Sequence, residues 1–391
     1  MRLITAKEDC TACGACVQVC PKSAIRLVDD GNGFMYPKVD TSLCVECENC
    51  KKVCPTDKTM LFPSKEGVAV AGYCRDEDVL SHSTSGGFLT GIVEKFGGVD
   101  VVVFGAQQLS DFSVIIRAVD LGHLDLIRRS KYAWSDTCQT FKECREFLLA
   151  GKKVVYTGMP CQIAGLNRFL GRDFDNLLTV EVVCHGPPSD LYWQKERSYL
   201  ERKVCARVVD FSCREKGRRW SDPVICYRFS NGKKFVEQLK YSDFHRIWMS
   251  RIISRPSCTS CRYAFADRVA DISLADYWHV NRKSPLFNDN RGTSVAFGNS
   301  MRGRSVLALL KESYYLESVD RQVMCKSKNA MHGPIAANPL RDVALNDLKR
   351  LDFENFVQKY APKSVRFYLE RFLAKFFGSS KAKAILRRAA L

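Results

Sequence analysis

Cysteine spacing near the amino terminus is the clearest chemical pattern in this sequence. The pattern Cys-x2-Cys-x2-Cys-x3-Cys-Pro occurs twice, 34 residues apart. The first copy is Cys10, Cys13, Cys16, Cys20 and Pro21, and the second is Cys44, Cys47, Cys50, Cys54 and Pro55. Thiolates are soft ligands that suit iron, and short loops between them can turn backbone amides toward cluster sulfurs. The repeat therefore predicts two [4Fe-4S] clusters, with a pair of zinc ribbons as the alternative.

The same spacing is that of two-cluster ferredoxins, in which the fourth cysteine of each run reaches across to the other cluster. This crossing assigns one ligand set to each cluster. The first set is Cys10, Cys13, Cys16 and Cys54, and the second is Cys44, Cys47, Cys50 and Cys20. We expect residues 1–62 to form this ferredoxin domain.

A lone Cys-x2-Cys pair, Cys258 and Cys261, indicates a third site that two thiolates cannot complete, because a cluster or a zinc ion needs about four ligands. Cys161 follows a Gly-x-Pro turn, and Cys184 ends a strand before a His-Gly-Pro-Pro loop. These four cysteines predict a third [4Fe-4S] cluster, while zinc or a metal-free pair stays open. Buried structural thiols are expected at the other seven, Cys74, Cys138, Cys144, Cys205, Cys213, Cys226 and Cys325.

Composition indicates a globular chain of two or three domains, because 391 residues that are 46% hydrophobic and 26% charged can bury a sizeable core. No segment reads as a signal peptide, and no apolar run approaches the roughly 20 residues of a membrane span. We therefore expect a cytoplasmic protein. In that compartment 19 cysteines indicate metal sites or a reactive thiol rather than disulfides.

The formal net charge of +17 is unevenly placed along the chain. Residues 1–60 contain eight basic and eight acidic side chains, so the excess lies in the remainder. That remainder should favour anions, such as nucleotide phosphates, an acidic electron carrier or an anionic lipid surface. A nucleic-acid partner is not expected, since the basic residues are spread out and no binding signature is present.

Beyond the cysteine repeat, the sequence has α/β character (α+β overall). Residues 98–106 predict a buried strand, residues 151–166 a strand, a turn and a helix start, and residues 177–189 another strand. Open α/β sheets place ligand groups at the carboxyl ends of their strands. Cys161 and Cys184 occupy such ends.

Seven segments, in order, closely resemble the coenzyme F-420 hydrogenase/dehydrogenase beta subunit family. They are SHSTSGGFLTGIVEKFGGV (81–99), RRSKYAWSDT (128–137), GKKVVYTGMPCQIAGL (151–166), VVCHGPPSDLYW (182–193), FSCREKGRRW (211–220), RPSCTSCRYAFADRVADISLADYW (255–278) and DNRGTSVAF (289–297). The chain departs from the usual pattern at Met159, where threonine is common, and at Arg129, where glycine is common. These departures leave the contacts on the substrate side open.

The resemblance implies a flavoprotein that binds FAD beside a [4Fe-4S] cluster. Family members exchange a hydride with a deazaflavin coenzyme or another two-electron partner, and pass single electrons along clusters. Their relatives include a reductase of a chlorophyll derivative that takes electrons from ferredoxin, so the organic substrate is not fixed. On this basis we expect residues 63–335 to form the FAD and [4Fe-4S] oxidoreductase body, followed by a basic helical region at 336–391.

The resemblance also implies FAD-binding residues. Small residues precede a helix at Ser83, Thr84, Ser85, Gly86 and Gly87, where a phosphate could bind; an ordinary helix cap is the alternative. Further expected contacts are Ser130, Lys131, Tyr132, Thr157, Gly158, Gln162, Asp271 and Asp276. Lys131 and His185 are the catalytic candidates, although Lys131 could be a solvated basic residue and His185 could simply bond backbone. Trp278 is expected in the core.

The carboxyl-terminal segment from Lys363 onward is basic and amphipathic. It contains eight Lys or Arg and one Glu, with phenylalanines at 367, 372, 376 and 377 at largely helical spacing. Such a helix could lie on an anionic membrane at the inner face or dock on an acidic partner, and a helix packed on its own domain is the alternative.

Two classes of function stay open from the sequence. The first is an enzyme that moves electrons between a carrier, either ferredoxin or a deazaflavin coenzyme, and an organic substrate. The second is a non-catalytic electron-transfer subunit of a larger redox complex.

Overall fold

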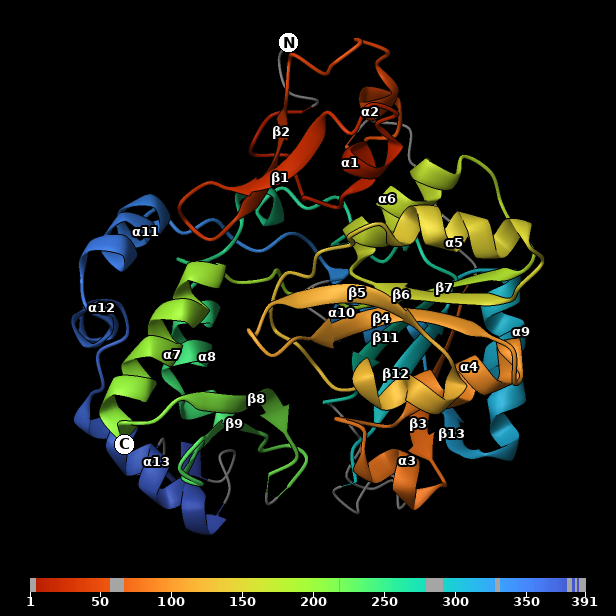
Figure 1. Cartoon of the computed structure of the whole chain (residues 1–391). Coiled ribbons are helices and arrows are strands. Elements are labelled where there is room, and N and C mark those ends of the chain that lie inside the picture. Colours follow the sequence, from red (N-terminus) through yellow and green to blue (C-terminus); the bar gives the residue numbers. More distant parts are fainter. Residues whose placement is uncertain are drawn as a thin grey trace. The chain divides into compact units, whose positions relative to one another are not determined.

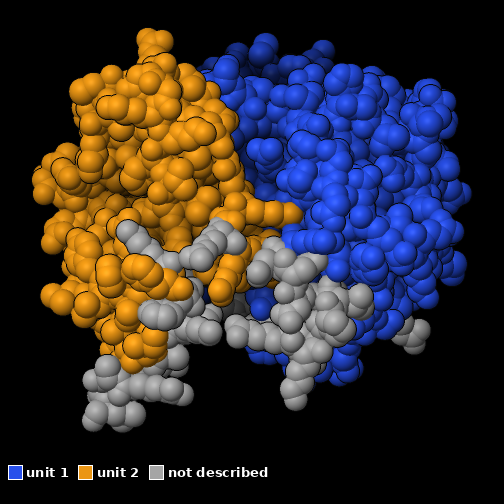
Figure 2. Space-filling model, turned by 90° about the horizontal axis from the view of Figure 1, so that it is seen from below, with its two compact units in different colours: residues 1–188, 255–336 blue, residues 189–254, 337–391 orange. Residues whose placement is uncertain are grey.

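The computed structural model describes residues 5–56, 67–217, 219–278, 291–327, 331–377, 382–383 and 385–386. The chain forms two compact units, one of residues 1–188 and 255–336 and the other of residues 189–254 and 337–391 (Figure 2). This division differs from the three predicted successive domains. The ferredoxin segment shares a unit with the predicted body, whereas residues 189–254 leave that body and pack with the carboxyl-terminal region. The predicted boundary between residues 62 and 63 lies outside the described residues.

The ferredoxin segment is a two-stranded hairpin with two short helices (Figure 1). Strands β1 (Ile25–Asp29) and β2 (Met35–Val39) pair antiparallel, and the helices are α1 (Ala15–Val19) and α2 (Asn49–Lys52). The carboxylate of Asp29 closes the hairpin turn by accepting hydrogen bonds from the amides of Gly31 and Gly33 at 2.6 and 3.1 Å. Both glycines have positive φ, which a residue with a Cβ adopts only with strain.

A mixed eight-stranded sheet forms the centre of the first unit, in the order β13-β3-β12-β11-β7-β6-β4-β5. Strands β11, β7, β6 and β4 are mutually parallel, and the outer strands join them antiparallel. Their bounds are β3 Val68–Cys74, β4 Val102–Gln108, β5 Val114–Val119, β6 Val154–Gly158, β7 Leu177–Val182, β11 Ile272–Asp276, β12 Ser294–Gly298 and β13 Tyr314–Ser318. The expected α/β character is therefore confirmed.

Helices cover both faces of this sheet (Figure 1). On one face, Phe88 and Ile92 of α4 (Phe88–Gly97) and Val306 of α9 (Met301–Leu309) pack on the strands. On the other, α5 (Thr140–Leu149) and α6 (Pro160–Leu170) share a core with Cys13 and Ala15 of the ferredoxin segment. The shorter helices are α3 Glu77–Ser81, η1 Leu121–Leu126, η3 Pro256–Cys258, η5 Leu310–Glu312 and α10 Arg321–Ser327.

Two of the three predicted strands lie where the sequence placed them. β6 and α6 form the expected strand, turn and helix; β7 is the next predicted strand, and Cys184 follows its carboxyl end. The strand expected at residues 98–106 begins later, at Val102. The prediction for Trp278 is wrong, because this side chain is 45% exposed rather than in the core.

The second unit contains a three-stranded antiparallel sheet and five α-helices among the described residues. The sheet order is β10-β9-β8, with β8 Val208–Glu215, β9 Val224–Phe229 and β10 Lys234–Gln238. The helices are α7 Asp190–Val204, α8 Asp243–Met249, α11 Arg341–Arg350, α12 Phe353–Tyr360 and α13 Val365–Phe377, with the short η2 at Leu239–Tyr241. An aromatic cluster of Tyr192, Trp193, Phe244 and Phe353 fills the space between the helices.

Helix α13 has one packed face and one exposed apolar face. Phe367 meets Tyr241 edge to face, and Glu370 and Arg371 form ion pairs with Lys240 and Glu237 at 2.6 and 2.9 Å. The predicted alternative of a helix packed on its own domain is therefore confirmed. Exposed apolar side chains follow helical spacing along the other face at Val365, Tyr368, Leu369, Phe372 and Phe376. The side chain of Phe377 lies outside the description. Within the described part of the chain, no helix combines the length and apolarity needed to cross a bilayer.

Candidate metal centres

The two cysteine runs fold in the same way because their loops repeat the same backbone conformation. Ala12 and Gly14 have positive φ in the first run, and Glu46 and Glu48, 34 residues later, have positive φ in the second. Left-handed residues between the cysteines curl each loop around a cavity. A short helix then follows in each copy, α1 after Gly14 and α2 after Glu48.

Each predicted ligand set of the ferredoxin segment lines one cavity. The first cavity is bordered by the first quartet, which we define as Cys10, Cys13, Cys16 and Cys54. The second is bordered by the second quartet, Cys20, Cys44, Cys47 and Cys50. The crossing of Cys20 and Cys54 between the two runs is thus present in the fold. Each quartet encloses its cavity with apolar neighbours such as Leu27 and Ile25, which limit the access of water.

Backbone amides and burial shape the chemistry of these thiols. The amide of Ala24 donates to Sγ of Cys20 at 3.3 Å. Desolvation raises the pKa of Cys13 to about 12, against a smaller opposing effect of the Ala15 amide. Desolvation also raises the pKa of Cys10 and, more strongly, that of Cys16. Buried thiols of this kind ionise readily only on binding a cation, so metal loading should release protons.

The four remaining predicted ligands come together from three separate segments of the first unit. Cys161 lies in the first turn of α6, Cys184 follows β7, and Cys258 and Cys261 come from the segment around η3. All four line one cavity of about 50 Å³, compared with about 20 Å³ for each of the other two. We call Cys161, Cys184, Cys258 and Cys261 the third quartet.

Local geometry fits the third quartet to a cluster. The amide of Gly186 donates to Sγ of Cys184 at 3.3 Å, and Gly186 has a φ of 84°. A Cβ at Gly186 would lie 3.2 Å from Sγ of Cys258, so the loop passes close to the sulfur. Desolvation raises the pKa of Cys184 to about 11 and that of Cys161 further, with the neighbouring cysteines adding to the rise at Cys161.

A single metal ion and a cluster need different arrangements of their ligands. Among the described residues, no three Cys, His, Asp or Glu side chains converge closely enough to hold one ion. Zinc draws its sulfurs to about 2.3 Å, whereas the larger iron-sulfur cubane needs four thiolates spread around a cavity. Each of the three cavities is bordered by four cysteines, the number of ligands that a cubane needs.

The first quartet lies next to each of the other two. Cys50 of the second quartet is close enough to Cys16 of the first to raise its pKa, after the larger effects of desolvation and of Cys13. Thr11 lines both the first and the third cavity. On α6, a Cβ at Gly165 would lie 2.9 Å from Sγ of Cys13, so glycine permits the helix to approach the first quartet.

A buried ion pair supports the loop that carries Cys261. Nε of Arg268 donates to Oε1 of Glu181, which lies on β7 shortly before Cys184, and both side chains are buried. The Arg268 Nη1 group also donates to the carbonyl oxygens of Tyr263 and Phe265 at 2.6 and 3.2 Å. Ser273 donates to the same Glu181 oxygen at 2.7 Å. The pair therefore ties the Cys261 loop to the strand that leads to Cys184.

Most of the residues that line the third cavity were not predicted as site residues. Thr11, Trp134, Arg255 and Tyr263 line this cavity together with the predicted His185. The indole nitrogen of Trp134 is buried without a hydrogen-bond partner. Arg255 and Tyr263 lie close to Cys258 and Cys261 in the sequence, and this closeness could have indicated them as site residues. Thr11 and Trp134 reach the cavity through long-range packing, which the sequence does not show.

Several predicted flavin residues gather at the carboxyl edge of the parallel strands. Thr84 and Ser130 share a hydrogen bond at 3.2 Å, so two distant segments lie side by side. Ser85 donates to the carbonyl of Thr293 at 3.1 Å, and Ser294 pairs in register with Asp276 at the end of β11. Thr157 and Gly158 end β6 at the same edge. Gly87, the N-cap residue of α4, has no side chain to cap the helix, and the Tyr314 hydroxyl accepts from the amide of Gly91 at 3.1 Å and donates to the carbonyl of Gly87 at 2.7 Å.

Three predicted flavin residues, Lys131, Gln162 and Asp271, bond to the protein itself. Nζ of Lys131 donates to the carbonyl of Ile127 at 3.0 Å and to that of Arg128. Gln162 is buried, donates to the carbonyl of Ser135 at 2.8 Å and accepts from the amide of Met159 at 3.0 Å. These contacts fix the segment after η1 and the start of α6, and cofactor contacts of Lys131 and Gln162 stay a prediction.

Asp271, the third of these residues, lies at the amino end of β11, the opposite end of the strand from Asp276. Its Oδ2 accepts two hydrogen bonds from Thr179 at 2.8 Å, and its Oδ1 accepts one from Ser300 at 2.5 Å. Asp271 thus joins β7 to the start of α9, and a role of either aspartate at a cofactor stays a prediction.

Packing also explains one of the glycines before α4. A Cβ at Gly86 would lie 2.5 Å from the carbonyl oxygen of Gly72 in β3, so the sheet alone requires glycine there. Gly87 has a φ of 74° and begins α4. Tyr132 is partly buried in the neighbouring segment. Neither Gly86 nor Gly87 is by itself evidence for a cofactor.

Comparison with known proteins assigns two parts of the chain. Residues 151–322 match the family described as the C terminus of the coenzyme F420 hydrogenase/dehydrogenase beta subunit, and this range includes the whole third quartet. Residues 9–58 match the 4Fe-4S dicluster domain, which includes the first and second quartets.

Individual relatives share shorter stretches. An uncharacterized ferredoxin of Methanocaldococcus jannaschii is 34% identical over 61 residues, which are 16% of this chain and 78% of that protein. The isethionate sulfite-lyase activating enzyme of Desulfovibrio desulfuricans is 32% identical over 83 residues, 21% of this chain, and the chain spans only 25% of that enzyme. A chain of the F420-reducing [NiFe] hydrogenase complex of Methanosarcina barkeri superposes with a TM-score of 0.43 and 16% identity, covering 81% of this chain and 95% of that one.

Proposed function

Because the chain belongs, through residues 151–322, to the coenzyme F420 hydrogenase/dehydrogenase beta subunit family and carries a 4Fe-4S dicluster domain, we propose that this iron-sulfur electron-transfer protein is an FAD-dependent oxidoreductase. It exchanges electrons between a carrier, either a ferredoxin or a deazaflavin coenzyme, and an organic substrate.

The observation that carries the proposal is the third quartet. Cys161, Cys184 and the Cys258 pair are far apart in the sequence, yet they line one cavity. This cavity shares Thr11 with the first quartet, so the ferredoxin segment leads directly to the family domain. A chain built only to bind a small molecule would not need a row of three thiolate sites inside one compact unit.

When bound, the clusters carry single electrons and FAD exchanges either one or two, which joins a one-electron carrier to a two-electron substrate. The residues of the chain supply position and protection. Arg268 and Glu181 hold the segment after Cys261, and the amides of Ala24 and Gly186 donate to quartet sulfurs. His185, which lines the third cavity, is the candidate for moving a proton beside the site.

Flavin binding at the carboxyl edge would use Thr84, Ser85, Ser130 and Asp276, next to Ser83, whose hydroxyl donates to the carbonyl of Val79 at 2.7 Å. The start of α4, whose N-cap residue is Gly87, lies beside these hydroxyls, and a helix start with small residues suits a phosphate. The topology brings this edge to the same side of the sheet as Cys161 and Cys184. FAD placed there would lie on the side of the third quartet.

Anaerobic purification with iron, sulfide and flavin analysis tests the proposal. We expect about twelve irons and one FAD per chain, because three quartets each hold four irons. About eight irons without flavin would contradict the oxidoreductase proposal and leave only the dicluster domain. Co-purification with a separate catalytic subunit would instead favour the role of an electron-transfer subunit.

Replacing Thr84 by aspartate should release FAD without unfolding the protein. Two like charges about 4 Å apart repel by roughly 1 kcal/mol in water and by more in a partly buried site, so flavin should bind about tenfold more weakly. The helix start tolerates a carboxylate. Fluorescence titration of the flavin-free protein with FAD measures the change.

The matched control for this substitution is Thr84→Val, which removes the hydrogen bond to Ser130 but adds no charge. It should weaken FAD binding much less than the aspartate does. Equal flavin affinity in Thr84→Asp and the parent protein, with iron content unchanged, would place the cofactor elsewhere.

We also propose that the exposed face of α13 contacts an anionic membrane surface from the cytoplasmic side. Replacing Leu369 and Phe372 by serine should lower binding to phosphatidylserine vesicles by about tenfold or more, since each buried apolar side chain contributes roughly 1.5 to 3 kcal/mol. Both side chains are exposed, so the melting temperature should stay unchanged.

Phe367→Ser is the control for this helix, because Phe367 packs on Tyr241 and its loss should lower the melting temperature instead. Vesicle co-sedimentation at low and high salt separates the apolar contribution from the electrostatic one. If the double variant binds vesicles as the parent does, the membrane role is wrong.

A further inference from the structure

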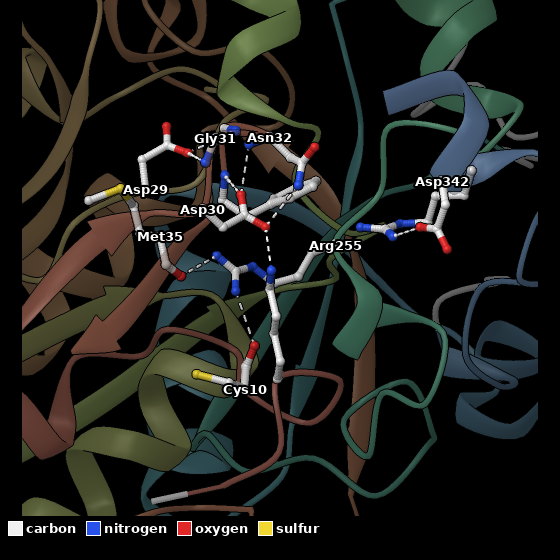
Figure 3. Close-up of polar contacts among 12 residues, drawn as sticks. Cys10, Asp29, Asp30, Gly31, Asn32, Met35, Arg255 and Asp342 are labelled. Atoms are coloured by element: carbon white, nitrogen blue, oxygen red, sulfur yellow. Dashed lines mark hydrogen bonds and ion pairs between the residues drawn. The ribbon is translucent and has the colours of Figure 1, made fainter. Parts of the chain in front are cut away.

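Arg255 is a buried cation held between backbone carbonyls. Its side chain is 2% exposed, and Nη1 and Nη2 donate to the carbonyl oxygens of Cys10 and Met35 at 3.1 and 2.9 Å. Figure 3 shows the guanidinium pointing toward both residues. Its charge also lies over the rings of Phe34 and Tyr36, 5.4 and 4.7 Å from their centroids.

These contacts leave the charge of Arg255 without a neutralising carboxylate. Among the described residues, no Asp or Glu forms an ion pair with it, and Nε is buried without a hydrogen-bond partner. The nearby carboxylate of Asp30 pairs with Lys7 at 2.8 Å instead. A buried ion without a counter-ion is strongly unfavourable. The protein groups around Arg255 therefore do not neutralise its charge.

The groups around Arg255 indicate which negative charge would neutralise its guanidinium. Its Nη1 group donates to the carbonyl oxygen of Cys10, a cysteine of the first quartet. Arg255 also lines the cavity of the third quartet. A [4Fe-4S] cluster with four thiolates carries roughly two negative charges when oxidised and three when reduced.

We propose that Arg255 is the shared counter-charge of the first and third quartets and raises the reduction potential of the clusters held by both. The inference rests on the proposed clusters. A fixed positive charge beside two sites stabilises the added electron at either one, and low-dielectric surroundings strengthen the effect. Arg255 thus sets how readily electrons are held at the clusters of the ferredoxin segment and of the family domain. The second quartet, which Arg255 does not contact, serves as an internal reference.

Redox titration of the anaerobically purified protein, followed by electron paramagnetic resonance, tests this role. In the titration each cluster takes one electron from dithionite, and no covalent bond changes. Arg255→Met should make reduction of two clusters at least about tenfold less favourable, a shift of about 59 mV to lower potential, while the third cluster keeps its potential. Arg255→Lys retains the charge and should shift both potentials much less.

Lys7→Met is the matched control, because it removes one positive charge beside the same Tyr36 ring from a side chain that is 51% exposed and screened by water. It should leave all three potentials in place. Unchanged potentials in Arg255→Met, or equal shifts of all three clusters, would overturn the proposal. If Arg255→Met and Arg255→Lys both lose iron, the guanidinium acts as a structural clamp and the electrostatic role is wrong.

Iron analysis of the same preparations separates this inference from the proposed function. About twelve irons with unmoved potentials would contradict the role of Arg255 alone. About eight irons in the parent protein would contradict the third cluster itself.

Discussion

Replacing both Cys258 and Cys261 by serine is expected to lower the iron content of the anaerobically purified protein from about twelve to about eight atoms per chain. The two thiolates supply half of the third quartet, and a serine hydroxyl is a poor ligand for iron. The first and second quartets lie in separate cavities and should keep their clusters. Iron and acid-labile sulfide assays measure the loss directly.

The control for this experiment is a second pair of cysteine substitutions, Cys138→Ser and Cys205→Ser. The sequence predicted buried structural thiols at both positions, but the structure exposes them, so this expectation was wrong for these two. The five other single cysteines are buried as expected. The control should retain all iron, and an unchanged iron content in the Cys258 and Cys261 variant would eliminate the third cluster.

Replacing Arg268 by methionine should destabilise the protein by about 3 to 5 kcal/mol, the usual cost of leaving one partner of a buried ion pair without the other. Glu181 would stay buried beside Ser273 with its cation gone. The carbonyls of Tyr263 and Phe265 would also lose their donor, which should loosen the loop that carries Cys261. Thermal unfolding and iron content should therefore fall together.

A double variant distinguishes the charge of the pair from its positioning role. Glu181→Leu combined with Arg268→Met leaves no buried charge and should recover much of the lost stability. It should not recover third-quartet iron if Arg268 positions the loop. Asp173→Asn, which removes a largely exposed partner of Arg302, is the control and should change the unfolding free energy by less than about 1 kcal/mol. A melting temperature unchanged by Arg268→Met would contradict the assigned role of the pair.

The sequence by itself determined the features that depend on neighbouring residues. The two cysteine runs predicted the ligand sets of the first and second quartets, because loops of two or three residues fix which sulfurs can face one centre. The strand, turn and helix around Cys161 also followed from local signals, since hydrophobic runs and a Gly-x-Pro turn act over a few residues. The resemblance then indicated which distant cysteines to consider together.

Only the tertiary structure decided how distant segments meet. It brought Cys161, Cys184 and the Cys258 pair to one cavity, placed Arg255 between that cavity and Cys10, and turned Lys131 toward backbone carbonyls. It also set Asp271 at the opposite end of β11 from Asp276 and joined residues 189–254 to the carboxyl-terminal region. Such contacts depend on strand order and on which buried polar groups find partners, and neither is encoded in the spacing of adjacent residues.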